Sequence, residues 1–104
     1  MLTYNDFQNE IVSLASELKA EYDLADALDH VHEVVDGLQA VIYYAQAWEL
    51  VVMIRQGSPD LYQDAQDMVD DICIDDTNLN KLMSAMAYSI YTVALNDYLY
   101  KTGE

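Results

Sequence analysis

Acidic residues at helical spacing are the feature that most limits what this chain can fold into. Between positions 23 and 36 they recur at steps of three or four residues, at Asp23, Asp26, Asp29, Glu33 and Asp36. The apolar residues of this stretch recur at the same steps, at Leu24, Leu28, Val31 and Val35. Each set lies on a single face of an α-helix but would be divided between the two sides of a β-strand. The stretch therefore predicts an amphipathic helix with carboxylates outside and core residues inside.

A second acidic row follows in the middle of the chain. Ser58-Pro59-Asp60 is typical of a helix start, with proline at the first helical position and an early acid. The acids of the expected helix again share one outward face, and a further acid follows them: Asp60, Asp64, Asp67, Asp71, Asp75 and Asp76. Between them, apolar residues recur on the inward face: Leu61, Ala65, Met68, Val69 and Ile72. A partial acidic line, which includes Glu10 and Glu17, is expected on the first helix.

Three further helices complete the predicted fold. Thr3 and Asp6 form a capping-box pattern that opens a helix to about Ala20. Residues 38–56 are apolar on almost every side, which predicts a central core helix ended by Gly57. A last helix, from a cap at Thr77 to about Lys101, is expected to be a structural support. We therefore predict an all-α chain, a single domain over residues 1–104, with about five helices in a small elongated bundle and acidic outer faces.

The charge balance limits the partners that this chain can bind. Its 104 residues include nineteen acids and four bases, a formal net charge of −15. Direct binding of nucleic acid or an anionic membrane is disfavoured, because both are polyanions. The single Cys73 excludes an internal disulfide, no apolar run approaches the length of a membrane span, and the start lacks the basic residues of a signal peptide. We expect a cytoplasmic protein, in the host cell if a phage encodes it.

Catalytic and metal-binding patterns are weak in this sequence. The serines and Cys73 lack the context of a nucleophile, the acidic run from Asp64 lacks the glycine of an EF-hand, and no Glu-x-x-His motif of a di-iron bundle occurs. His30 and His32 are interpreted as surface histidines beside acids. We therefore expect no enzymatic activity, no cofactor and no bound metal. The alternative is a Mg²⁺-dependent, all-α nucleotide pyrophosphohydrolase resembling MazG, with acid pairs as ligands: Asp23 and Asp26, Glu33 and Asp36, Asp67 and Asp70.

Unmixed acidic rows have a physical cost that an ordinary solvated face avoids. Like charges at helical spacing destabilise a helix by about 0.2–0.5 kcal/mol per pair. One acid per 3.5 residues places a charge every ~5 Å along a helix axis, whereas duplex DNA carries one per ~1.7 Å. Two or three parallel rows approach the charge density of DNA within a factor of about two. The rows thus favour a surrogate for the DNA backbone that attracts DNA-binding proteins, with a merely soluble acidic face as the alternative.

Residues 23–52 resemble the centre of the Ocr-like family of phage anti-restriction proteins. The likeness lies in His32-Glu-Val-Val-Asp36, a short turn, and then Tyr43-Tyr44-Ala45 with Trp48. The resemblance implies an all-α homodimer whose carboxylates imitate the phosphates of bent DNA. It also implies that the protein occupies the DNA groove of type I restriction-modification enzymes. The acids of residues 23–36 would then be phosphate surrogates, and Tyr43, Tyr44 and Trp48 core or dimer residues. The family's strongly acidic tail is replaced here by residues 98–104, and an anti-CRISPR role would use the same physics.

Overall fold

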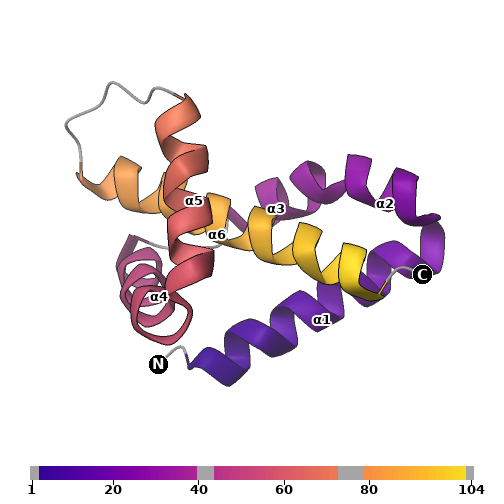
Figure 1. Ribbon diagram of the computed structural model, residues 1–104, viewed down its shortest axis with the longest axis horizontal. Coiled ribbons are helices and arrows are strands. Elements are labelled where there is room, and N and C mark those ends of the chain that lie inside the picture. The colour runs from indigo at the N-terminus through magenta and orange to yellow at the C-terminus, as the bar shows by residue number, and fades with distance from the viewer. Residues whose placement is uncertain (1–2, 40–43, 73–78, 103–104) are drawn as a thin grey trace.

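The computed structural model describes residues 3–39, 44–72 and 79–102, and everything below concerns these ranges. They contain α-helices and no strand, so the predicted all-α fold is confirmed. The helices are α1 (Tyr4–Glu21), α2 (Leu24–Asp29), α3 (Val31–Gln39), α4 (Tyr44–Gly57), α5 (Pro59–Ile72) and α6 (Leu79–Thr102) (Figure 1). The molecule measures 39 × 29 × 25 Å. None of the described helices is long and apolar enough to cross a membrane.

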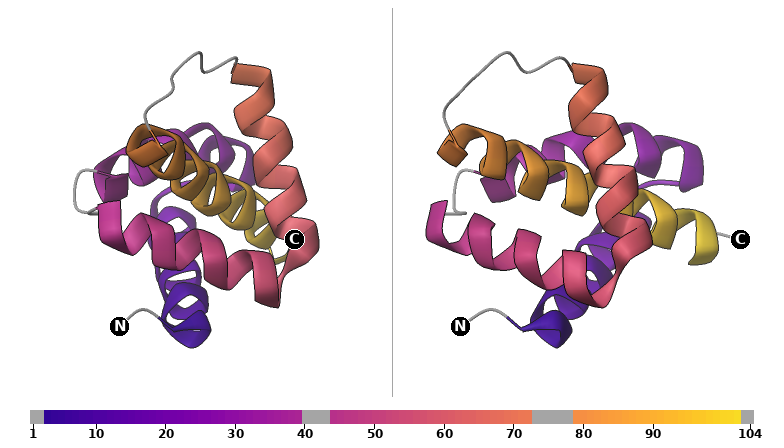
Figure 2. Two further views of the ribbon diagram at one scale, coloured as in Figure 1. Left: turned by 90° about the vertical axis from the view of Figure 1, so that its left-hand side faces the viewer. Right: turned by 60° about the vertical axis from the view of Figure 1, so that its left-hand side comes forward.

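The long helix α6 is the centre of the molecule. It packs against each of the other five helices. Figure 1 shows α5 crossing α6, with α2 and α3 above α6 and α1 below it. Four consecutive residues, from Ser89 to Thr92, are all buried. Successive residues are about 100° apart around a helix, so this run is covered on every side. The last helix, expected to be a structural support, is thus the helix on which the other five pack (Figure 2).

Helix α4 is less central than its sequence predicts. It begins at Tyr44 and not near residue 38, because residues 38 and 39 belong to α3. One stripe at steps of three or four residues is buried: Ala47, Leu50, Val51 and Ile54. On another face Trp48 and Val52 remain 42% and 48% exposed. The prediction of a core helix buried on most sides is thus wrong, since only one stripe faces α5 and α6.

Helix starts agree closely with the local sequence signals. The Thr3 hydroxyl accepts from the Asp6 backbone N–H, and the Asp6 carboxylate accepts from the Thr3 N–H, each at 3.1 Å. The Asp23 carboxylate accepts from the Asp26 N–H at 2.9 Å. Proline at position 59 opens α5, as predicted. Thr77, the predicted cap of α6, lies outside the described residues.

The helix predicted over residues 23–37 is divided in two at His30. The His30 ring donates from Nδ1 to the Asp26 carbonyl at 2.7 Å, and its backbone N–H also reaches that carbonyl. The same ring stacks on Tyr22, with centroids 4.1 Å apart. These contacts cap α2 at His30, and α3 begins at the next residue. Gly37 lies inside α3, although a glycine after an amphipathic stretch is typical of a helix end.

Candidate partner-binding surface

The first acidic row is carried by α2 and α3. Each of its five carboxylate side chains is exposed, as the spacing predicts: Asp23, Asp26, Asp29, Glu33 and Asp36. The inward stripe of the same segment packs against the core, with Val31 and Val35 fully buried. Because α2 and α3 are separate helices, the row continues across the break at His30. We call this surface the α2–α3 row.

The second acidic row lies on α5. The side chains of Asp60, Asp64, Asp67 and Asp70 are exposed, and Ala65 and Val69 on the opposite side are buried. The Gln63 amide donates to the Asp67 carboxylate at 3.0 Å. We call the four exposed acids the α5 row. Of the other predicted members, Asp71 belongs to α5 with its side chain undescribed, while Asp75 and Asp76 lie outside the described residues.

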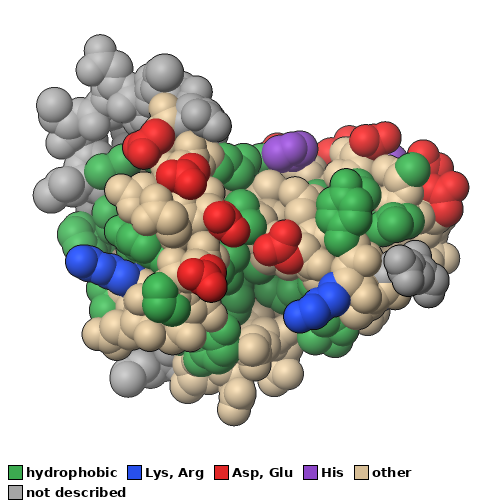
Figure 3. Space-filling model, in the orientation of Figure 1, with side chains coloured by type: hydrophobic (Ala, Val, Ile, Leu, Met, Phe, Trp, Pro, Cys, Tyr) green, Lys and Arg blue, Asp and Glu red, His purple; other side chains and the backbone are tan. Residues whose placement is uncertain are grey.

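Both rows contribute to one face of the molecule. Figure 3 shows acidic side chains following α5 at the left and others over α2 at the right, in the same view. Most of the surface between them is hydrophobic or uncharged (Figure 3). A partner that approached this face would therefore meet negative charge along α5 and again over α2.

The described basic side chains contact groups other than the nine carboxylates of the two rows. Lys19 donates to Thr102 and lies 5.4 Å from the centroid of the Tyr98 ring. Arg55 lies 5.8 Å from the centroid of the Tyr62 ring. Lys101 interacts electrostatically with Asp97 of α6. Of the chain's four bases, Lys101 is thus the one whose described contact, Asp97, lies close to the α5 row, and the charge of both rows stays mainly negative.

The acids predicted on α1 have different environments. Glu17 is exposed, as expected for a surface that meets a partner. Glu10 is half-buried and interacts with the phenol of Tyr91. Burial, and then the Glu10 carboxylate, raise the pKa of Tyr91 to about 12. Glu10 therefore does not lie on a fully outward line, because the chain packs α6 against this side of α1.

Asp97 of α6 belongs to the acidic face, although its sequence position gave no reason to include it. It is exposed and lies close enough to Asp64 of α5 to interact with that carboxylate. Partial burial and then Asp64 raise the pKa of Asp97, while Lys101 lowers it. A lone acid within an apolar helix shows no periodic pattern. Only the packing of α5 on α6 brings Asp97 beside the α5 row.

Asp36 of the α2–α3 row also contacts a side chain of α6. The Tyr88 hydroxyl forms a hydrogen bond with the Asp36 carboxylate, and the Nδ1 atom of His32 lies 2.9 Å from the same hydroxyl. Burial, and then Asp36, raise the pKa of Tyr88. If Tyr88 donates to Asp36, its oxygen accepts from His32, which fixes the proton on Nδ1. This chain of contacts attaches α3 to α6 and orients one acid of the α2–α3 row.

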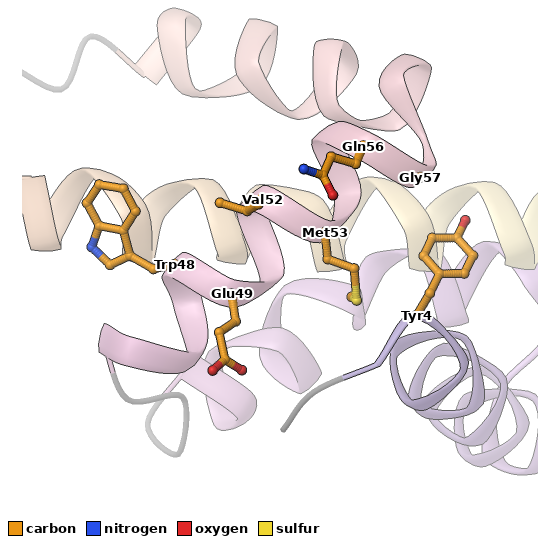
Figure 4. Close-up of a pocket in the computed structure, with 7 residues that line it drawn as sticks. All are labelled: Tyr4, Trp48, Glu49, Val52, Met53, Gln56 and Gly57. Atoms are coloured by element: carbon orange, nitrogen blue, oxygen red, sulfur yellow. The ribbon is translucent and has the colours of Figure 1, made fainter.

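Two of the three aromatic residues that were predicted to be core or dimer residues belong to α4. Tyr43 lies outside the described residues, and Tyr44 begins α4 with its side chain undescribed. Trp48 is not a core residue, because 42% of it is exposed. With Val52, Met53 and Tyr4 it borders an open depression of about 670 Å³. Figure 4 shows Trp48 and Val52 projecting from α4 and Tyr4 from the start of α1.

The start of α1 is held against the end of α4. The hydroxyl of Tyr4 forms a hydrogen bond with that of Ser58. A Cβ atom at Gly57 would lie only 3.3 Å from the ring of Tyr4, so the missing side chain allows this close approach. Tyr4 is therefore a fixed part of the depression beside Trp48.

The acid pairs considered as Mg²⁺ ligands do not converge. Among the described side chains, no three of the His, Cys, Asp and Glu residues come together in a group that could hold a metal ion. A Mg²⁺ ion held by protein side chains alone would need several oxygen ligands around one point. The pairs instead remain members of the two rows, spread along separate helices.

No protein-family model, curated protein or solved structure matches this chain. The likeness of residues 23–52 to the Ocr-like family therefore stays a prediction from the sequence. The function has to be argued from the acidic face and from the exposed face of α4.

Proposed function

We propose that this protein is a DNA mimic of the anti-restriction kind, which inhibits a host DNA-binding defence enzyme by occupying its DNA channel. A type I restriction-modification enzyme is the target that the resemblance favours. The observation that carries the proposal is the pair of exposed acidic rows that contribute to one face. A channel lined by Lys and Arg binds phosphates mainly through charge and the release of counterions, and carboxylates offer it the same interaction.

The dimensions of the molecule support this role. Its longest axis, 39 Å, is close to one turn of B-form DNA, which is about 34–36 Å long. The α2–α3 row and the α5 row supply nine exposed carboxylates, and Asp97 adds a tenth. One copy would thus cover about one turn of a DNA site, at a lower charge density than the duplex.

A homodimer is part of the proposal, because a single copy covers only a short channel. The exposed pair Trp48 and Val52 on α4 supports the dimer, with Met53 and Tyr4 at its edge. Large aromatic side chains at the centre of an interface contribute most of its binding energy. Packing of α4 against α4 of a second copy would bury this patch and double the length of the acidic track.

The test is inhibition of plasmid cleavage by a purified type I restriction enzyme, with this protein and an unrelated DNA duplex as competitors. We expect inhibition that falls as added duplex rises. We also expect it to weaken with salt, because exposed charges are screened over a Debye length of ~8 Å at physiological ionic strength. Inhibition that is independent of salt, or unaffected by competing DNA, would contradict the proposal.

A matched pair of charge reversals tests the place of binding. Asp67→Lys and Glu21→Lys change the net charge equally, and both residues are exposed on helices. Asp67 belongs to the α5 row, whereas Glu21 is the last residue of α1. We expect Asp67→Lys to weaken inhibition several-fold more than Glu21→Lys, because it puts a repulsive charge against the channel. Equal effects would mean that only net charge matters.

A further inference from the structure

The outer face of α4 carries opposite charges on its two flanks. Trp48 and Val52 form its centre and are 42% and 48% exposed. Glu49 precedes Val52 by three residues, Arg55 follows it by three, and both side chains are exposed. Because successive residues of an α-helix are about 100° apart, Glu49 lies about 60° to one side of Val52 and Arg55 about 60° to the other. The apolar strip is thus bordered by a carboxylate on one flank and by a guanidinium on the other.

A second copy can pair with this face in two symmetric ways, because most homodimers are related by a two-fold axis. If the axis runs across α4, the two helices are antiparallel and each flank meets the same flank of the other copy, Glu49 near Glu49 and Arg55 near Arg55. If the axis runs along α4, the helices are parallel and the Glu49 flank of each copy meets the Arg55 flank of the other. Charged flanks of parallel paired helices form ion pairs of this kind. Charge complementarity therefore favours the parallel pairing.

The direction of the acidic face favours the same pairing. Figure 1 views α4 nearly along its axis, whereas the left view of Figure 2 shows it lengthwise. In the orientation of Figure 1 the acids of α5 face the reader (Figure 3). The acidic face thus points along the axis of α4. A rotation about an axis along α4 keeps this direction, whereas a rotation about an axis across α4 reverses it. Only the parallel pairing puts the acidic faces of both copies on the same side.

We infer that two copies of this chain pair through parallel α4 helices around a two-fold axis, with Trp48 and Val52 at the centre. Glu49 of each copy lies against Arg55 of the other. This inference rests on the proposed function, to which it adds the symmetry and the charge pairs of the dimer. Figure 1 shows α5 next to α4, with α2 and α3 farther away. The α5 rows of the two copies therefore lie near the axis and the α2–α3 rows farther from it, so the surface that a partner protein meets is built from both copies.

Contacts within one copy are compatible with these charge pairs. The Arg55 guanidinium lies 5.8 Å from the centroid of the Tyr62 ring. A guanidinium above a ring keeps its N–H donors directed outward in its own plane, where a carboxylate can accept them. A carboxylate accepts several hydrogen bonds, so the pair does not require Glu49 to be free of other contacts. The apolar centre supplies the main driving force, since large aromatic side chains dominate the binding energy of interfaces.

Disulfide trapping in the whole protein distinguishes the two pairings. Cys73→Ser removes the native thiol, and Gln56→Cys places a new one on the exposed face of α4. In a parallel pair the two copies of position 56 lie at the same height, whereas an antiparallel pair centred on Val52 separates them by about 12 Å along the axis. We expect Gln56→Cys to form a linked dimer on mild oxidation and the exposed control Tyr100→Cys of α6 to remain unlinked. No linked dimer, or linking only in a mixture with Glu49→Cys, as an antiparallel pair requires, would overturn the inference.

A charge exchange tests the two flanks. Glu49→Arg should weaken the dimer roughly tenfold in sedimentation equilibrium, because both Glu–Arg pairs become Arg–Arg pairs. The same substitution lowers the net negative charge, which by itself favours association, so the loss has to come from the flanks. Glu21→Arg changes an exposed acid of α1 and should not weaken the dimer.

The double variant Glu49→Arg/Arg55→Glu provides the rescue. It restores both pairs with their signs exchanged and keeps the net charge of the wild-type protein, so we expect wild-type association. Circular dichroism checks that each variant keeps its helices. Unchanged association of folded Glu49→Arg, or no recovery in the double variant, would refute the charge pairs.

Failure of this inference and failure of the proposed function give different results. Association and disulfide linking are measured without any host enzyme. If Gln56→Cys does not link but plasmid cleavage is still inhibited in a salt-dependent way, only the arrangement of the dimer is refuted. If the parallel dimer forms but no restriction enzyme is inhibited, the interface stands and the proposed target falls.

Discussion

Helices α4 and α6 are both rich in apolar residues, yet they are used in different ways. In α6 every residue from Ser89 to Thr92 is buried, so its own chain covers it on all sides. In α4 one stripe is buried, while Trp48 and Val52 remain exposed. The acidic rows lie on neither of these two helices. They lie on α2, α3 and α5, which pack around α6.

An apolar helix has to be packed against other parts of a protein, but its own sequence does not specify which parts. For α6 the cover is the other five helices. For the outer face of α4 no described segment of the chain supplies it, which is the reason for proposing a second copy there. Four predictions test this difference between α4 and α6.

The largest effect is expected for truncation in α6. Leu95→Ala removes a fully buried side chain, and such changes lower the free energy of unfolding by about 2–5 kcal/mol. The matched change on the exposed face of α4 is Val52→Ala, which should stay within about 0.5 kcal/mol. Urea unfolding at low protein concentration measures both while keeping the contribution of a dimer small. Comparable losses would contradict the division between the helices.

The next effect concerns association. Trp48→Ala should weaken a homodimer by about 2 kcal/mol or more, because an exposed aromatic residue at the centre of an interface acts as a hot spot. Sedimentation equilibrium gives the dissociation constant, and circular dichroism checks that the helices persist. Tyr100→Ala is the control, since Tyr100 of α6 is also a large exposed residue, at 64%. A monomeric wild-type protein, or equal weakening by Tyr100→Ala, would remove the argument for α4.

The third prediction tests burial on the α1 side of α6. Burial and Glu10 raise the pKa of Tyr91 to about 12 from its ordinary value of 10.0. Between these values the folded protein keeps a proton that the unfolded chain has lost, so stability falls as pH rises through this window. The loss is about 2 kcal/mol by pH 12. Tyr91→Phe should remove this part of the slope, which urea unfolding at a series of pH values measures; an unchanged slope would contradict the burial of the Tyr91 hydroxyl.

The smallest effect is expected for the one acid of α6 that joins the acidic face. Its raised pKa means that the folded state disfavours the charged form of Asp97. Stability from this group is therefore present at acidic pH and lost as pH rises through its folded pKa. Asp97→Asn should raise the melting temperature at neutral pH, by an amount equivalent to a few tenths of a kcal/mol at most. The gain should vanish in acid, and a loss at neutral pH would show that Lys101 stabilises Asp97 instead.

Local signals in the sequence predicted most of the helices and of the acidic face. The helix starts at Thr3, Asp23 and Pro59 were readable because a cap depends on residues only a few positions apart. The exposure of the acids on α2, α3 and α5 was readable because a periodic pattern assigns charged residues to the solvent side. The all-α fold followed from these two signals together.

Other features of the molecule depend on contacts between residues far apart in the chain. The division at His30 depends partly on stacking against Tyr22 of the preceding segment. The half-burial of Glu10 beside Tyr91 and the approach of Asp97 to Asp64 depend on how α1 and α5 pack on α6. The sequence by itself determined which faces are acidic and which are apolar, since periodicity acts within one helix. Which apolar helix lies at the centre, and which acids meet, was decided by packing, because a helix pattern carries no information about its neighbour.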